Sequence, residues 1–245
     1  MLDKRKFYIN GKWVSPSKQN DFEVINPSTE DAYAVISLGS KDDVDKAVQS
    51  SKIAFESWKK ISKEERLKLL GTLLEIYKKR FNEMAKAISD EMGAPIDWAT
   101  DVQTGSGQAH LEDFIIRLKE FNFDEHFNSK SNNHICYEPI GVCGLITPWN
   151  WPINQIALKV VPALATGCTM ILKPSEIAPI SGMLFAEMID EAGFPAGVFN
   201  LVNGDGAGVG THISGHPDID MVSFTGSTRA GRLISKNAAE TIKRV

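Results

Sequence analysis

The spacing of hydrophobic residues changes near residue 140 of this chain. Before that point, apolar residues recur every three or four positions over long stretches, which predicts amphipathic helices. After it, four short apolar runs alternate with helical segments, and these runs are residues 142–146, 169–172, 198–203 and 221–226. Four strand–helix units in succession predict an α/β fold with a doubly wound parallel sheet.

The first part of the chain carries turn and helix-start signals. Asn10-Gly11 lies between two β-prone runs and predicts a hairpin. Residues 24–29 and 32–40 suggest further strand and turn near the edge of the fold. Ser40, followed by Asp43, then predicts a capped helix start.

Two more helices are expected before residue 120. Ser62 and Glu65 form a capping box, which predicts one long helix that ends at Gly93. The third helix is expected over residues 97–118. Residues 121–133 then turn polar without a helical period, so they are typical of a linker or an exposed excursion.

These patterns divide the chain into three parts. Residues 1–120 supply the hairpin and the helices, residues 121–140 connect, and residues 141–245 form the alternating α/β part. With 245 residues and 42% hydrophobic content, the chain can bury a sizeable core.

Charge and hydropathy exclude several kinds of partner. The net charge of -4 gives no reason to expect nucleic acid or an anionic membrane. The amino terminus has no apolar signal core, and no run approaches the roughly 20 apolar residues of a membrane span. We therefore expect a cytoplasmic protein.

The cysteines and histidines lack the spacing of a metal site. Cys136, Cys143 and Cys168 show no CxxC pattern, and their odd number suits a reducing compartment. Each lies in or beside an apolar run, so we expect three small buried side chains without a catalytic role. His212 and His216 are four residues apart, but a glycine and a proline interrupt any shared helix, and we predict no metal.

Unusual polar residues follow the first predicted strand. Trp149 and Asn150 lie in the loop after residues 142–146, at the carboxyl end of a strand, where open parallel sheets bind ligands. The Asn150 amide can donate a hydrogen bond to an oxyanion. The alternative is that Asn150 caps the helix beginning near Pro152, and the residues alone favour this interpretation.

A second polar group follows the next strand. Lys173 directly precedes a proline, so we expect its ammonium to emerge at the edge of the site. Glu176 is expected to open the next helix. A lysine and a carboxylate at this spacing can hydrogen-bond the two ribose hydroxyls of an adenine nucleotide. The alternative is a solvated lysine and a first-turn glutamate that the helix dipole favours.

Glycine-rich stretches follow the third and fourth strands. Gly204, Gly206 and Gly210 fit GxGxxxG, which differs in spacing from the usual dinucleotide fingerprint. Such glycines can also simply make a tight turn. Gly226 and Ser227 lead into a helix whose free amides and positive dipole end could meet a pyrophosphate.

Three of these stretches together resemble the aldehyde dehydrogenase superfamily. They are ITPWN at residues 146–150, KPSE at residues 173–176 and FTGS at residues 224–227. The likeness extends from NGKW at residues 10–13 to the last residue. It implies a Rossmann-like cofactor-binding fold and, over residues 121–140, a β arm that adds to the sheet of a neighbouring subunit. The resemblance further implies that the full-length parent is a homodimer or homotetramer.

The resemblance also implies roles for the candidate residues. Asn150 would hold the substrate oxygen during attack on an aldehyde, and Lys173 and Glu176 would contact the adenosine ribose. A carboxylate there would repel the extra phosphate of NADP, so NAD is the expected cofactor and NADP remains possible. The implied cofactor-binding residues are Ile146, Thr147, Pro148, Trp149, Lys173, Ser175, Glu176, Gly206, Gly210, Phe224, Thr225, Gly226 and Ser227.

Two motifs of the family are absent from these 245 residues: ELGG, which carries the general-base glutamate, and the GQxC-type motif with the nucleophilic cysteine. We therefore expect an amino-terminal, cofactor-binding portion of an enzyme that oxidises an aldehyde to a carboxylic acid with NAD. This portion alone is expected to be inactive. Two alternatives stay open: a noncatalytic nucleotide-binding or interaction module, and a relative that reduces an acyl phosphate or an acyl-CoA.

Overall fold

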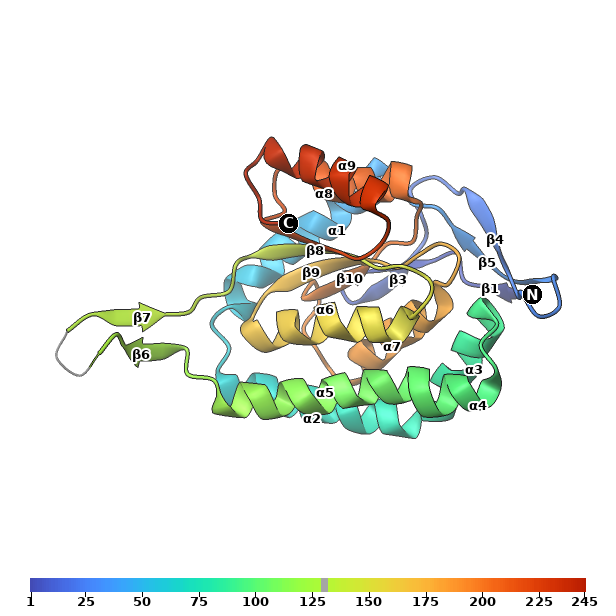
Figure 1. Ribbon diagram of the computed structural model, residues 1–245. Helices are drawn as coiled ribbons and strands as arrows, with labels where there is room; N and C mark the ends of the chain where they lie inside the picture. Colours follow the sequence, from blue (N-terminus) through green and yellow to red (C-terminus); the bar gives the residue numbers. More distant parts are fainter. Residues whose placement is uncertain (129–131) are drawn as a thin grey trace.

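The computed structural model describes residues 1–128 and 132–245. Its centre is a six-stranded sheet in the order β11-β8-β9-β10-β2-β3 (Figure 1). The first four are parallel neighbours, and the last two join them antiparallel. The strands are β8 (Val142–Ile146), β9 (Thr169–Lys173), β10 (Phe199–Leu201), β11 (Met221–Phe224), β2 (Phe7–Ile9) and β3 (Lys12–Val14).

Helices cover both faces of this sheet, so the predicted doubly wound architecture is confirmed (Figure 1). On one face lie α6 (Pro152–Thr166) and α7 (Ile180–Glu191), and beyond them α2 (Lys63–Lys79) and α5 (Gly105–Glu120). On the other face lie α1 (Lys41–Trp58), α8 (Thr211–Gly215) and α9 (Thr228–Ala239). Each face buries its own apolar cluster, because sheet residues alternate between the two sides.

The predicted hairpin and helix caps are confirmed. Asn10 and Gly11 both have positive φ, 53° and 71°, as a tight two-residue hairpin turn requires. At the start of α1, the Ser40 amide and hydroxyl donate to Asp43 Oδ2 at 2.9 and 2.7 Å. At the start of α2, the Glu65 amide donates to the Ser62 hydroxyl at 3.2 Å, which completes the capping box.

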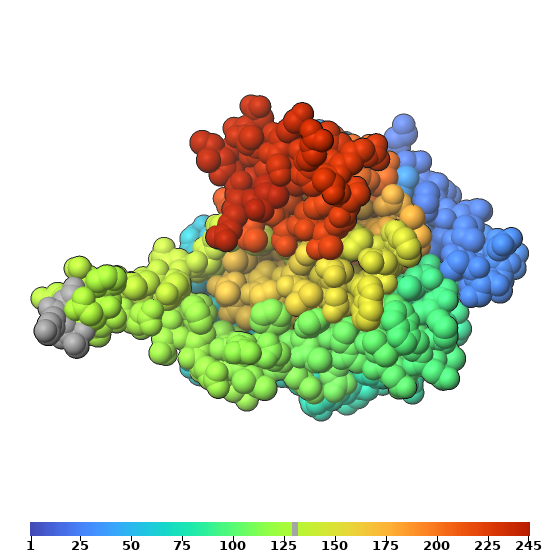
Figure 2. Space-filling model, in the orientation of Figure 1, coloured from blue at the N-terminus to red at the C-terminus, as the bar shows by residue number. Residues whose placement is uncertain are grey.

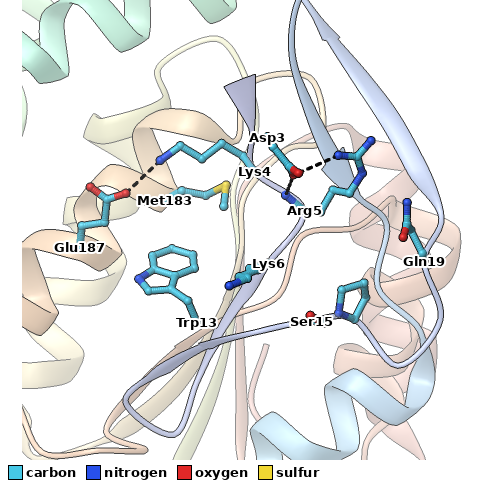
Figure 3. A pocket seen from close by; sticks show the side chains of 10 residues that line it. Asp3, Lys4, Arg5, Lys6, Trp13, Ser15, Gln19, Met183 and Glu187 are labelled. Carbon is cyan, nitrogen blue, oxygen red and sulfur yellow. Dashed lines mark hydrogen bonds and ion pairs between the residues drawn. The ribbon is translucent and has the colours of Figure 1, made fainter. Parts of the chain in front are cut away.

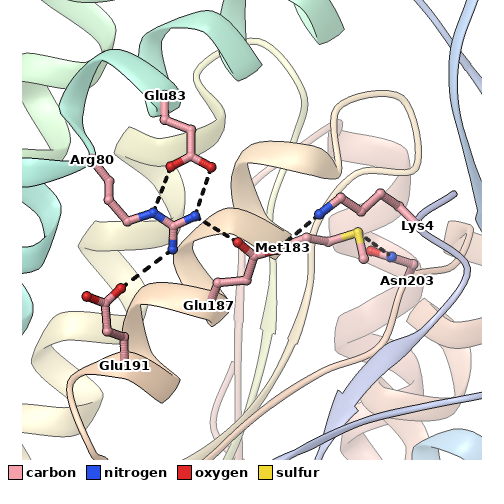
Figure 4. Close-up of polar contacts among 7 residues, drawn as sticks. All are labelled: Lys4, Arg80, Glu83, Met183, Glu187, Glu191 and Asn203. Carbon is pink, nitrogen blue, oxygen red and sulfur yellow. Dashed lines mark hydrogen bonds and ion pairs between the residues drawn. The ribbon is translucent and has the colours of Figure 1, made fainter. Parts of the chain in front are cut away.

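The single long helix predicted up to Gly93 is wrong, because it breaks at Arg80. There φ and ψ are -99° and 17°, and the chain restarts as α3 (Phe81–Met92). The Arg80 guanidinium donates to Glu83 at 2.7 and 2.8 Å and to Glu187 of α7 at 2.8 Å (Figure 4). These ion pairs hold the junction between α2 and α3 against α7. The spacing of hydrophobic residues does not predict them, because they join charged side chains.

The third predicted helix is confirmed, with an irregular start. It consists of α4 (Ile96–Trp98), a π-helical turn η1 (Ala99–Thr104) and α5. The Tyr77 hydroxyl donates to the Thr104 carbonyl at 2.8 Å, so a buried side chain of α2 satisfies a carbonyl of this turn.

A two-stranded arm leaves the body of the molecule between α5 and β8 (Figures 1 and 2). It pairs β6 (Asp124–His126) with β7 (His134–Cys136) in antiparallel register. The predicted excursion is thus confirmed for its described residues, while residues 129–131 lie outside them. Cys136 is exposed on this ribbon, so the expected burial is wrong for Cys136. Cys143 and Cys168 are buried, as expected.

A small second sheet lies beside the amino terminus. It is built from β1 (Leu2–Asp3), β5 (Ala32–Ser37) and β4 (Asp21–Ile25). The strand signal over residues 32–40 is confirmed by β5, β4 lies mostly before the stretch 24–29, and β1 was not predicted. At the other end of the chain, the Val222 amide of β11 donates to the Arg244 carbonyl at 2.8 Å. In the described part of the chain, no helix is long and apolar enough to cross a membrane.

Candidate functional site

The loops after the four parallel strands gather at one edge of the sheet. Ile146 pairs with both Lys173 and Phe224, and Leu172 pairs with Leu201, so the four strands end level with one another. Between β8 and β11 the strand order reverses, which is where open α/β sheets bind ligands. The structure therefore brings ITPWN, KPSE, the glycine loop and FTGS to a common edge.

Lys173 is buried, which corrects the expectation that its ammonium emerges at the edge. Only 3% of the residue is exposed, and Nζ donates to the carbonyls of Pro174 at 2.9 Å and Gly204 at 2.6 Å. A third, longer contact of 3.4 Å joins Nζ to Glu176 Oε2. Burial lowers the pKa of Lys173, and the Glu176 carboxylate opposes that shift. Lys173 therefore ties the loop after β9 to the loop after β10.

Glu176 lies in a turn, four residues before α7 begins at Ile180, so the expectation that it opens this helix is wrong. The amino end of α7 is instead capped by Glu91 of α3. Glu91 Oε2 accepts from the Ile180 amide at 2.5 Å, and Oε1 accepts from the Ser181 amide at 3.1 Å. The Glu176 side chain, 26% exposed, is thus left at the surface of the site.

Glu91 was missed by the sequence reasoning. It is 89 residues from the amide that it caps, and no local pattern signals such a contact. Burial raises the pKa of Glu91 to about 7, against the backbone hydrogen bonds that lower it. This carboxylate fixes the start of α7 and hence the length of the KPSE turn.

Asn150 is exposed, and Trp151 rather than Asn150 occupies the cap position of α6. No side chain caps that helix start, so the capping alternative is not realised. Trp151 packs edge-on against Trp98 with ring centroids 5.1 Å apart, which holds the loop against the η1 region. Among the described residues the Asn150 side chain has no hydrogen-bond partner, so its amide could donate to a ligand.

Lys159 is a second residue that the sequence reasoning missed. It projects from α6, and its Nζ donates to the Thr225 hydroxyl in the loop after β11 at 2.8 Å. Burial lowers the pKa of Lys159. The available signal was that Lys159 is the one charged residue in the sequence of this helix. This contact joins the ITPWN side of the site to the FTGS side.

The glycines at the edge serve different purposes. A Cβ on Gly206 would meet nothing within 4 Å, so the loop is open there, whereas one on Gly226 would lie 2.5 Å from the Phe224 ring. A side chain at position 226 would therefore force the Phe224 ring to move. The Gly208 amide is already used, because it donates to Asp205 Oδ1 at 2.6 Å.

The FTGS stretch ends at the amino terminus of α9, as predicted. The Ser227 hydroxyl accepts from the Ala230 amide at 3.2 Å and so caps the helix. Gly226, Ser227 and Thr228 are exposed, which leaves the positive end of the helix dipole open to an anion. The edge thus offers an open glycine loop, a helix start and the Glu176 carboxylate, which fits a nucleotide cofactor.

The structure also has a cavity that lies away from the predicted site residues. A cavity of about 580 Å³ lies between the amino-terminal segment and α7, where Lys4 pairs with Glu187 at 3.0 Å (Figure 3). Its described lining includes Trp13 and Met183 but none of the predicted site residues. Within residues 1–128 and 132–245, no group of three or more His, Cys, Asp or Glu side chains could hold a metal ion.

Comparison with known proteins identifies the class to which this fold and edge belong. The aldehyde dehydrogenase family profile matches residues 13–245, so the chain belongs to the aldehyde dehydrogenase family. A 3-succinoylsemialdehyde-pyridine dehydrogenase from a Pseudomonas species is 52% identical over 246 residues, covering 100% of this chain and 51% of that protein. A putative aldehyde dehydrogenase from Staphylococcus saprophyticus is 44% identical, with the same coverage of 100% and 51%.

Solved structures give the same result. An aldehyde dehydrogenase from Bartonella henselae has a TM-score of 0.99 and 60% identity, and the match covers 100% of this chain and 52% of that one. A mutant aldehyde dehydrogenase C from Pseudomonas syringae, in complex with NAD+ and octanal, has a TM-score of 0.96 and 47% identity, with coverage of 98% and 49%. The chain spans about half the length of these relatives.

Proposed function

We propose that this chain is the cofactor-binding portion of an enzyme that oxidises an aldehyde to a carboxylic acid with NAD. The observation that carries the proposal is the convergence of ITPWN, KPSE, the glycine loop and FTGS at the carboxyl edge of β8 to β11. The NAD+ complexes of family members from Pseudomonas syringae and Bacillus cereus support it.

The residues at this edge would divide the work of binding. Glu176 would accept hydrogen bonds from ribose hydroxyls, and Lys173 would donate to the ribose with the N–H that now makes its longest contact, 3.4 Å to Glu176. The exposed start of α9 and the open loop at Gly206 would hold the pyrophosphate. When bound, the nicotinamide supplies the hydride acceptor. Asn150 donates to the aldehyde oxygen, where negative charge develops during attack.

The chain alone is not expected to turn over aldehyde. Cys143 and Cys168 are buried within or beside the sheet, and Cys136 lies on the arm, so none of the three is presented beside Asn150. Incubation of the purified chain with octanal and NAD should produce no NADH absorbance at 340 nm. Sustained NADH production that Asn150→Ala abolishes would contradict this proposal.

Calorimetric titration with NAD tests the cofactor site. The unmodified chain should bind, Glu176→Ala should bind about tenfold more weakly because a charged acceptor is lost, and the control Glu120→Ala should bind as the unmodified chain does. Glu120 is an exposed carboxylate at the end of α5. Equal affinities for both variants would remove Glu176 from the site. Absence of binding by the unmodified chain would contradict a retained cofactor site and would favour a structural remnant or a misfolded fragment.

The same carboxylate gives a preference between the two dinucleotides. Glu176 would repel the 2′-phosphate of NADP, so we propose NAD as the physiological cofactor. Glu176→Gln keeps the size of the side chain and removes its charge. It should lower the dissociation constant for NADP and so bring it closer to the dissociation constant for NAD. An unchanged ratio of the two constants would contradict the proposed role of Glu176.

The arm supports a proposal about assembly. β6 and β7 form an exposed two-stranded ribbon whose outer edges lack strand partners among the described residues. Such edges can add to the sheet of another copy, so we propose a homodimer or homotetramer. Light scattering should give a multiple of 27.0 kDa, and replacing residues 124–136 with a short glycine–serine linker should give the monomer. A monomeric mass before that replacement would contradict the proposal for this chain.

A further inference from the structure

Arg66 of α2 is a buried cation that forms no ion pair with a described carboxylate. Only 7% of the residue is exposed, and its Nε is buried without a hydrogen-bond partner. No carboxylate within residues 1–128 and 132–245 forms an ion pair with its guanidinium. A guanidinium carries five N–H donors, and of its three nitrogens only Nε is both fully buried and unpaired among the described residues. Leaving such a donor unpaired is costly.

The neighbours of Arg66 orient its guanidinium and leave its donors unused. The guanidinium carbon lies 4.9 Å from the centre of the Phe123 ring, a cation–π contact. Nη1 lies against the turn at Gly167, where an added Cβ would approach it to 2.8 Å. The carboxyl end of α6 favours a positive charge there. Burial nevertheless lowers the pKa of Arg66, so these contacts stabilise the charged guanidinium by less than its burial destabilises it.

Arg66 lines a cavity of about 480 Å³ that also contains Lys59 and Lys60. Lys59 is engaged by Glu56 at 2.9 Å, whereas Lys60 is exposed and has no partner among the described side chains. Glu138 is the one carboxylate in the described lining, against three cations. The cavity is therefore electropositive. The Arg66 guanidinium supplies a planar donor, and Lys60 supplies an exposed ammonium.

We propose that this cavity binds a small oxyanion, a phosphate or a carboxylate group, through Arg66 and Lys60. A planar guanidinium matches two oxygens of such a group, and stacking on Phe123 keeps its plane fixed. The oxyanion would accept from the two terminal nitrogens of the guanidinium, because Nε itself is closed to solvent.

This site is distinct from the proposed cofactor site. Its residues Pro139 and Thr166 come just before β8 and β9, so the cavity lies at the amino ends of these strands. The candidate cofactor loops lie at the carboxyl ends. A test of the oxyanion site is therefore independent of a test of the proposed aldehyde oxidation.

Calorimetry and thermal unfolding with sodium phosphate, and separately with disodium succinate, test the proposal at an ionic strength matched with sodium chloride. The two salts distinguish a phosphate from a carboxylate ligand. Saturable binding of at least one salt is expected. Lys60→Ala should weaken it about fivefold, while Lys18→Ala, which removes an exposed lysine outside the cavity, should leave it unchanged.

Arg66→Met provides the second variant, because methionine retains an unbranched chain to pack on Phe123 without the charge. It should abolish the rise in unfolding temperature that the anion produces. Absence of saturable binding by the unmodified protein would overturn the proposal. So would equal weakening by Lys60→Ala and Lys18→Ala, since that would indicate general charge screening.

Discussion

Lys173 combines a structural role with a place at the proposed site. Its ammonium is buried and donates to two backbone carbonyls that belong to different loops. Sequence reasoning identified the residue but placed its ammonium at the edge, because the spacing before a proline says nothing about where the next loop folds. The carbonyl of Gly204, 31 positions later, decides its orientation.

Replacing Lys173 should therefore affect stability as well as binding. Lys173→Ala leaves the carbonyls of Pro174 and Gly204 without their donor, and we expect a loss of about 2–3 kcal/mol in the free energy of unfolding. Urea unfolding measures this loss. If stability is unchanged while NAD affinity falls, the lysine serves the ligand alone and the structural role is wrong.

Glu91 gives a prediction about pH. Its pKa in the folded protein is about 7, above the ordinary value of 4.5, so between these values the folded state binds the proton more tightly than the unfolded state. Stability from this group should therefore fall as pH rises from 5 to 8. Two other groups lie near the Glu91 carboxyl: the Asp90 carboxylate, which also raises the pKa of Glu91, and the Tyr33 side chain.

Urea unfolding of the unmodified protein and of Glu91→Gln, at several pH values over this interval, isolates the contribution. The glutamine variant should lose less stability than the unmodified protein as pH rises, because it has no proton to release. Parallel curves for the two proteins would show that Glu91 does not titrate in this range.

Among the helices and strands, features that depend on neighbouring residues could be predicted from the sequence, and features that depend on long-range contacts could not. The Asn10-Gly11 turn and the caps at Ser40 and Ser62 depend on residues within three positions of each other, and all are confirmed. The break at Arg80 depends on Glu187, more than 100 residues away. Hydrophobic spacing continues through such a break, so it could not be predicted from the pattern.

The π-helical turn before α5 yields a prediction of its own. The Tyr77 hydroxyl satisfies the Thr104 carbonyl in the buried interior. Tyr77→Phe should cost about 1–2 kcal/mol in the free energy of unfolding, because the carbonyl stays buried without its donor. Tyr137→Phe on the exposed arm is the matched control and should change stability by less than about 0.5 kcal/mol. Equal effects would contradict this role for Tyr77.

For the whole molecule, the alternation of short apolar runs and helical segments was enough to predict the parallel sheet and its two covered faces. The same alternation placed ITPWN, KPSE and FTGS at one edge, because parallel strands bring their carboxyl ends together. The sequence did not predict that the first hairpin joins the main sheet beside β10, since pairing between distant strands leaves no local pattern. Division of the chain at residues 120 and 140 stays an interpretation.

We propose that NAD binds at the carboxyl edge of the parallel strands. Hydrogen exchange of the purified chain, measured with and without saturating NAD, tests it directly. We expect slower exchange in peptides that cover residues 146–150, 173–176, 204–210 and 224–227, with no change around Arg66. Protection centred on the Arg66 cavity, with none at the four loops, would contradict it.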